Sequence, residues 1–178
     1  MTILVRSDAL STSDVDSSAD AVADGHLLDL LTSGLAVDGS LVAWQIGLGA
    51  LAAAVVIRRE GPVVWWLAAL AGHVGSALIG YALIGVATAL GSASADASSD
   101  DPDYGISAVL AATLGALSAS GVRAGDRLIV AVGIVAFVAL LPFSIGWVDI
   151  EHPLAFGLGA AVVLGLGSHH ARALRRQR

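Results

Sequence analysis

The side chains best suited to chemistry in this sequence are the hydroxyl of Ser107 and the imidazole of His152. They form the simplest pair of nucleophile and general base, because imidazole accepts the hydroxyl proton and later returns it to the leaving group. Each residue stands at the start of an apolar run rich in glycine and alanine. The residue types leave a simpler interpretation open, in which Ser107 caps a helix and His152 is a polar residue at a membrane interface.

Several other kinds of chemistry are excluded or lack a signal. The chain contains no cysteine, which excludes disulfides, a cysteine nucleophile and a thiolate metal site. It has no phosphate-binding loop and no dinucleotide fingerprint, so we expect no cofactor. The adjacent His169 and His170 have no carboxylate nearby, and we expect no metal site there. A net charge of -6 argues against a nucleic-acid partner, because phosphate would be repelled.

The elements that must position Ser107 and His152 are indicated by composition. Of the 178 residues, 56% are hydrophobic and 13% are charged, and the mean hydropathy is +0.82. Soluble chains are roughly 45–50% apolar and about 25% charged, so the expected solvent is a bilayer and the expected neighbours are membrane lipids. All nine basic residues are arginine and 13 of the 15 acidic residues are aspartate, which is typical of proteins from concentrated salt.

Five apolar runs predict an all-α, polytopic membrane bundle of about five transmembrane helices. A helix needs about 20 residues to cross a hydrocarbon core of about 30 Å. The longer runs meet this length, and the shorter ones can borrow a turn from their flanks. The runs cover residues 41–57, 63–90, 105–121, 128–148 and 153–167.

The connecting segments alternate in charge, and eight of the nine arginines lie on one side of a five-span arrangement. By the positive-inside rule, this side is cytoplasmic. We therefore expect a multi-pass protein of the cell membrane with its N-terminus outside and its C-terminus inside. The expected parts are a disordered acidic extracytoplasmic tail, an interfacial segment, the transmembrane domain and a basic cytoplasmic tail. Their respective ranges are 1–25, 26–40, 41–167 and 168–178.

Small residues line the helices that carry the two candidate catalytic groups. Asp103 is a suitable N-cap for the helix of Ser107. Ala155 and Gly159 follow His152 at intervals of three and seven residues, so the three share one helix face. Such small faces allow helices to approach closely in lipid. We therefore expect the two helices to pack together and to bring Ser107 and His152 to a similar depth near the outer surface.

These motifs together resemble the rhomboid intramembrane serine proteases. DYGISAVLAATLGAL, from Asp103 through Gly105 to Leu117, resembles the GxSx helix of that family, and EHPLAFGLG (151–159) resembles its last core helix. GHVG (72–75) resembles a motif of small rhomboid-like membrane proteins. The likeness covers roughly residues 26–167, although no span precedes the interfacial segment as it does in the six-helix core. It implies a rhomboid-like fold with Ser107 as nucleophile and His152 as general base. The implied substrates or clients are transmembrane segments of other proteins.

Active rhomboids also use a side-chain amide, in a HxxxN pattern, as a hydrogen-bond donor to the oxyanion. The corresponding segment here is LVAWQ (41–45), which lacks the histidine. By the resemblance, Gln45 is the candidate donor, since its amide can give the same hydrogen bond. The alternative role for Gln45 is a hydrogen bond between helices.

Two rival functions remain open at this point. The missing histidine of the HxxxN pattern, the missing first helix and Pro153 favour a catalytically inactive rhomboid-like protein that binds membrane-protein clients. His73, near the middle of its span, and the glycine-rich helices favour a small channel or transporter. A more ordinary role for His73 is a neutral imidazole bonded to a backbone carbonyl or hydroxyl across the bundle.

Overall fold

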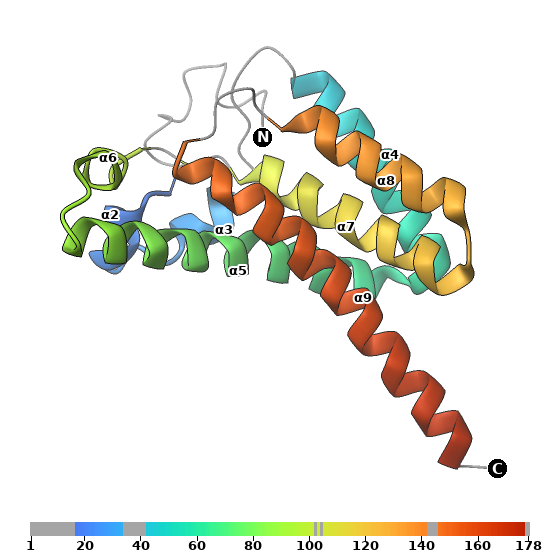
Figure 1. Ribbon diagram of the computed structural model, residues 1–178. Coiled ribbons are helices and arrows are strands. Elements are labelled where there is room, and N and C mark those ends of the chain that lie inside the picture. Colours follow the sequence, from blue (N-terminus) through green and yellow to red (C-terminus); the bar gives the residue numbers. More distant parts are fainter. Residues whose placement is uncertain (1–16, 34–41, 102, 104, 142–145, 177–178) are drawn as a thin grey trace.

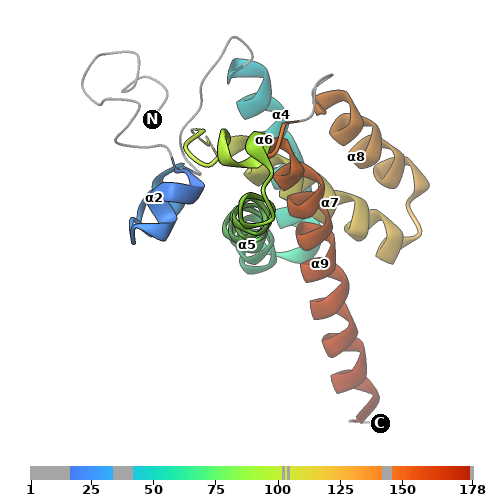
Figure 2. The same cartoon turned by 60° about the vertical axis from the view of Figure 1, so that its left-hand side comes forward.

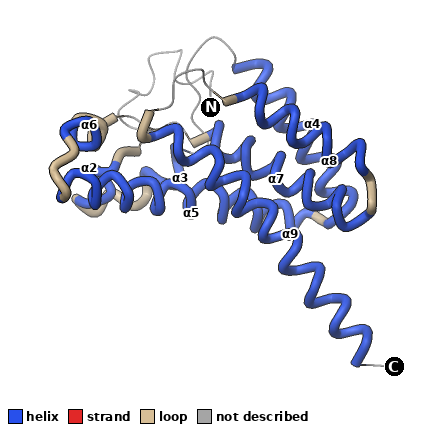
Figure 3. The backbone as a smooth tube through the Cα atoms, in the orientation of Figure 1, coloured by secondary structure: helices blue, strands red, loops and turns tan. Residues whose placement is uncertain are grey.

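The computed structural model describes residues 17–33, 42–101, 103, 105–141 and 146–176, with the side chains of 42 and 167–176 left aside. The regular elements of this part are all helices, as Figure 3 shows. The short helices are α2 (Ala19–Ala23), α3 (Asp29–Ser33), α6 (Ala93–Asp96) and the 3₁₀ turn η2 (Val148–Ile150). The long ones are α4 (Val42–Glu60), α5 (Pro62–Ala89), α7 (Ile106–Ala124), α8 (Arg127–Leu140) and α9 (Glu151–Arg176).

The central helix is α7, which packs against α4, α5, α8 and α9 (Figure 1). Every α7 residue from Leu110 to Gly121 is buried. Figure 2 looks nearly along α5 and shows α9 beside it, with α8 on the other side of α7. The main apolar core lies around α7 and includes Val56, Leu114 and Val163.

The predicted close packing of the small-residue helices is confirmed. A Cβ added to Gly115 on α7 would overlap the backbone carbonyl of Phe156 on α9, and one added to Gly159 on α9 would overlap the carbonyl of Ala112 on α7. The two backbones are therefore in direct contact at their crossing. Ala155 is fully buried in the same interface. This contact brings the first turns of α7 and α9, which carry Ser107 and His152, to the same end of the bundle.

Within the described part of the chain, three helical segments are long and apolar enough to cross a membrane: α5, α7 and Val148–Leu166 of η2 and α9. The expected count was five. α8 has 14 residues, because its helix ends at Leu140 instead of continuing through the apolar run to 148. α4 has 19 residues, but its last turn carries Arg58, Arg59 and Glu60. The structure thus supports membrane-spanning helices without establishing the fivefold count.

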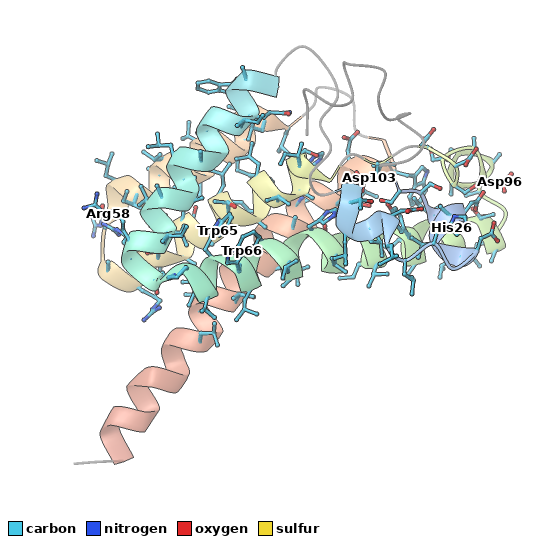
Figure 4. The ribbon with its side chains drawn as sticks, turned by 180° about the vertical axis from the view of Figure 1, so that it is seen from behind. His26, Arg58, Trp65, Trp66, Asp96 and Asp103 are labelled. Carbon is cyan, nitrogen blue, oxygen red and sulfur yellow. The ribbon has the colours of Figure 1, made fainter. Side chains whose placement is uncertain are left out.

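Two basic turns meet at one end of the bundle. The turn between α4 and α5 contains Gly61, whose φ of 91° favours glycine. Two ion pairs join this turn to the turn between α7 and α8. Arg59 pairs with Asp126 at 2.6 Å, and Arg123 pairs with Glu60 at 2.5 Å. Figure 4 places Arg58 at this end and Asp96 and Asp103 at the opposite end. The segregation of charge predicted from the alternating connections is therefore present in the fold.

Two sequence-based expectations were wrong at the acidic end. Ser17 to Asp24 was assigned to a disordered tail, yet Ser17 is buried and α2 has Ser18 as its N-cap. Asp103 was expected to cap the helix of Ser107. The helix instead begins at Ile106, its N-cap is Gly105, and Asp103 is paired through its backbone with Ser17.

The predictions for the interfacial segment and for the C-terminal tail agree with the structure to different degrees. α3 lies in the expected interfacial segment, and it buries Leu30 against Tyr81 and Ile84 of α5 while Leu27, Leu28 and Leu31 stay exposed. Residues 34–41 of that segment lie outside the described part of the chain. α9 begins two residues before Pro153, which occupies the first turn as expected. It continues to Arg176, so most of the expected cytoplasmic tail is helical.

Candidate functional site

The two candidate catalytic residues and the candidate oxyanion donor line one cavity of about 200 Å³. Ser107 comes from the first turn of α7, His152 from the first turn of α9 and Gln45 from the first turn of α4. Asp149 of η2 and the apolar Phe137 and Leu140 of α8 complete the wall used below. Four helices and one 3₁₀ turn therefore bring a hydroxyl, an imidazole, an amide and a carboxylate to one cavity.

The start of α7 is placed by a contact between Gly105 and His73. A Cβ on Gly105 would overlap the imidazole ring of His73 on α5, so only glycine fits there. The His73 Nε2–H donates to the backbone carbonyl of Leu30, and the ring is 3% exposed. This is the structural role, a bond to a backbone carbonyl across the bundle, that we expected for His73. The imidazole thus supports the turn that presents Ser107, two residues beyond Gly105.

The ring of His152 is oriented by the turn that precedes it. Its Nδ1–H donates to the backbone carbonyl of Asp149, with 3.2 Å between nitrogen and oxygen. In a neutral imidazole one nitrogen is a donor and the other an acceptor, so this bond leaves Nε2 as the acceptor. An acceptor Nε2 is the form that a general base requires. The sequence did not indicate this role of Asp149, because a backbone carbonyl can come from any residue type.

Ser107 is half-buried at the wall of the cavity. Among the described residues no hydrogen bond joins its hydroxyl to the ring of His152. Hydrogen bonds between catalytic groups are often long in unliganded proteins and tighten only when substrate is bound. The two residues therefore line the same cavity without a hydrogen bond between them in the described structure.

Gln45 stands between two cavities. It lines the site of Ser107 and His152 and also a larger cavity of about 540 Å³ that runs between α4 and α5 over α7. The larger cavity is bounded by apolar residues that include Ile46, Leu70 and Trp66. Figure 4 shows Trp65 and Trp66 on α5 where it faces α4. No described residue forms a hydrogen bond with the Gln45 side chain, so the alternative role as an interhelical hydrogen bond is not observed.

A second polar cluster lies beside the site but does not open into it. Asp103 and Glu151 are 5% and 2% exposed, and both lie against one turn of α5, Glu151 at Gly80 and Asp103 at Tyr81. The hydroxyl of Tyr81 donates to Oδ2 of Asp103 at 3.3 Å. Burial raises the pKa of Asp103, with His73 and Glu151 acting in the opposite direction. The sequence indicated a role for Asp103 alone, as a helix cap, and did not indicate the pair, because nothing local links the two acids.

The described residues hold no group of three or more histidine, cysteine, aspartate or glutamate side chains that could bind a metal ion. No protein-family model, no curated protein and no solved structure matches this chain. The function has to be argued from the site itself.

Proposed function

We propose that this protein is a rhomboid-type intramembrane serine protease that cleaves transmembrane segments of other proteins with a Ser107–His152 dyad. The observation that carries the proposal is the convergence of Ser107, His152 and Gln45 on one cavity, from three different helices. The sequence motifs independently assign the roles of nucleophile, base and oxyanion donor to these three residues. A purely structural role for each of them gives no reason for the three to meet.

The reaction follows the usual course of a serine hydrolase. Nε2 of His152 takes the proton of Ser107 as Oγ attacks the peptide carbonyl carbon. The imidazolium then gives that proton to the leaving amine, and the peptide bond breaks to leave an ester on Ser107. Water, with His152 again as base, hydrolyses the ester and restores the serine. The carbonyl of Asp149 accepts the proton of Nδ1, which leaves Nε2 to act as the base.

The negative charge of each tetrahedral intermediate needs a donor. The side-chain amide of Gln45 faces the same cavity and can donate an N–H to the oxyanion. A donor that is not engaged elsewhere in the described structure is free for this role without breaking another bond.

The membrane arrangement is part of the proposal. A rhomboid-like fold with five spans places the turns that carry Arg58, Arg59 and Arg123 in the cytoplasm. The opposite end, which holds the first turns of α7 and α9, then lies near the extracytoplasmic surface, where water for hydrolysis is available. The apolar cavity between α4 and α5 adjoins the site and suits an apolar substrate segment.

The deciding experiment uses the purified chain in lipid vesicles with a fluorescent reporter that contains a transmembrane segment. Ser107→Ala and His152→Ala should each lower kcat by roughly 10³-fold or more. Ser120→Ala is the matched control, because this serine lies about 20 Å further along α7 and its buried hydroxyl has no partner in the described structure. His26→Ala is the control for the histidine, since His26 lies on an exposed part of the chain. Unchanged cleavage in both site variants would remove the dyad.

A catalytically inactive rhomboid-like protein that binds clients is the second candidate. It is favoured by one observation, namely that no hydrogen bond joins Ser107 to His152 in the described structure. A serine-directed fluorophosphonate probe separates the two candidates. The protease is labelled at Ser107 and loses the label in His152→Ala, whereas the client-binding protein stays unlabelled while still retaining the reporter in a pull-down.

A further inference from the structure

The two buried acids, Asp103 and Glu151, lie shortly before Ser107 and His152 in the chain. Glu151 directly precedes His152 and is the first residue of α9. Asp103 lies two residues before Gly105, the N-cap of the helix that carries Ser107. Any force between the two carboxyls therefore acts between the first turns of α7 and α9.

Asp103 is held in place from two sides. Its backbone exchanges hydrogen bonds with Ser17, at 2.7 and 3.2 Å. Its carboxylate accepts the hydroxyl of Tyr81, which also lies 2.8 Å from the hydroxyl of Ser17. The Asp103 side chain consequently has a defined position at the end of α5 and α7.

The side chain of Glu151 is closely packed, but its carboxyl oxygens lack hydrogen-bond partners in the described structure. Its side chain lies against Gly80 of α5, where an added Cβ would come within 3.0 Å of its Cγ. Neither carboxyl oxygen has a hydrogen-bond partner in the described structure, and Asp103 is bound by Tyr81, the residue that follows Gly80 on α5. A buried, ionised and unpaired carboxylate is very costly, so this environment favours a proton between the two acids.

The groups around the pair do not neutralise two negative charges. Those that face it are His73 and Tyr81 from α5 and His152 from α9. In the described structure neither acid forms an ion pair with an arginine. His73 donates Nε2–H to Leu30 and is buried, which disfavours a charge on its ring. Two close carboxyls without a cation hold one proton in common, as in other buried acid pairs.

We propose that Asp103 and Glu151 share one proton, and that this shared proton is the positioning element that holds the first turns of α7 and α9 together and so keeps Ser107 within reach of His152. Loss of the proton leaves two like charges in a dry environment, which pushes these turns apart and switches the protease off. This inference rests on the proposed function. Neither acid lines the cavity of Ser107 and His152, so both act through the residues beside them.

The sign of the pH dependence follows. Burial raises the pKa of Asp103 above its ordinary 3.8. A carboxyl with a raised pKa stabilises the fold fully below its unfolded pKa, and that contribution is lost as pH rises through the folded value. Both the cleavage rate and the thermal stability of the folded chain should therefore fall on the alkaline side.

The experiment measures kcat and the melting temperature of the full chain in detergent micelles across a neutral-to-alkaline pH series. For the natural sequence we expect kcat to fall about tenfold per pH unit once the pair ionises. Glu151→Gln supplies a permanent amide donor to Asp103, so it should keep its neutral-pH activity into the alkaline range. Glu60→Gln is the matched control, because Glu60 is the other glutamate of the chain and pairs with Arg123 at the far end. It should show the same alkaline fall as the natural sequence.

A second measurement does not depend on activity. Infrared spectra at neutral pH should contain the carbonyl band of a protonated carboxyl, which is lost in Glu151→Gln and retained in Glu60→Gln. If Ser107→Ala leaves cleavage unchanged, the proposed protease is lost while the band and the melting curves still test the shared proton. Absence of the band at neutral pH, or an alkaline fall in Glu151→Gln equal to that of the natural sequence, would overturn the inference. Glu151→Ala, if it folds, should show low activity at every pH.

Discussion

The backbone carbonyl of Asp149 lies 3.2 Å from Nδ1 of His152 and accepts its proton, which leaves Nε2 as the acceptor of the ring. The carboxylate of Asp149 is at 3.8 Å from the same nitrogen, and its other oxygen accepts the N–H of Gly146 at 2.8 Å. The group that orients the proposed base is thus a peptide carbonyl, which mutation of the Asp149 side chain does not remove.

Asp149→Ala should therefore retain most of the activity. We expect a loss of kcat below about tenfold, because the bond from Gly146 and a carboxylate 3.8 Å from the ring contribute little compared with the base itself. The measurement is kcat with the membrane reporter, alongside His152→Ala. A loss as large as that of His152→Ala would show that the carboxylate, not the carbonyl, orients the ring.

Gln45→Ala should act on the transition state and not on binding. Removal of one oxyanion donor typically costs about 10²–10³ in kcat, and KM should stay nearly constant. Gln45→Glu, which keeps the size but carries no N–H donor at neutral pH, should be at least as damaging. Steady-state kinetics with the reporter check this. A rise in KM at constant kcat would instead make Gln45 a substrate-binding residue of the larger cavity that it also lines.

The crossing of α7 and α9 should tolerate no added methyl group. Gly159→Ala pushes a Cβ into the carbonyl of Ala112, and such overpacking costs about 1–3 kcal/mol. The control, Gly157→Ala, lies two residues earlier on α9 and meets nothing within 4 Å. Alanine favours helix over glycine, so this control should be unchanged or up to about 1 kcal/mol more stable. Unfolding of both variants in the same detergent gives the comparison. Equal stability of the two would contradict the close crossing.

Acid should weaken the contact between the two basic turns. A hydrogen bond from Arg59 is the main cause that lowers the pKa of Asp126, with the N–H of Ile129 adding to it. A carboxyl with a lowered pKa stabilises the fold above its unfolded pKa, and this is lost as pH falls through the folded value. The melting temperature should therefore drop in strong acid.

Asp126→Asn should flatten that acid dependence while keeping the cap, because an asparagine oxygen still accepts from Ile129 at the start of α8. Asp126→Ala removes the cap as well and should be the less stable of the two at neutral pH. Melting curves at several acidic pH values test both statements. An unchanged acid limb in Asp126→Asn would place the responsible group elsewhere.

Much of the bundle could be predicted from local patterns. Apolar runs predicted long helices, and small residues at helical spacing predicted the close crossing that Gly115 and Gly159 make. The span count did not follow as simply, since α8 stops at Leu140 and α4 ends in charged residues. Run length in the sequence measures hydrophobicity, whereas helix length also depends on where the backbone turns.

In the candidate site, too, some features could be predicted from the sequence and others could not. Residue types and motif order named Ser107, His152 and Gln45, and the structure brings these three to one cavity. The role of His73 was also predicted, because a buried imidazole needs a partner and a backbone carbonyl is the nearest kind. Asp149 was not recognised, since a backbone carbonyl acceptor leaves no mark in the identity of its residue.

The sequence by itself determined that the helices are apolar enough for a membrane, which of their faces pack together and which chemical groups lie at their ends. Only the tertiary structure decided that Asp103 does not cap its helix. It is buried near Glu151 instead, and its backbone pairs with that of Ser17. The physical reason is that capping and periodicity depend on neighbours in the chain. Burial of a charge depends on segments far apart in sequence that meet only when the chain has folded.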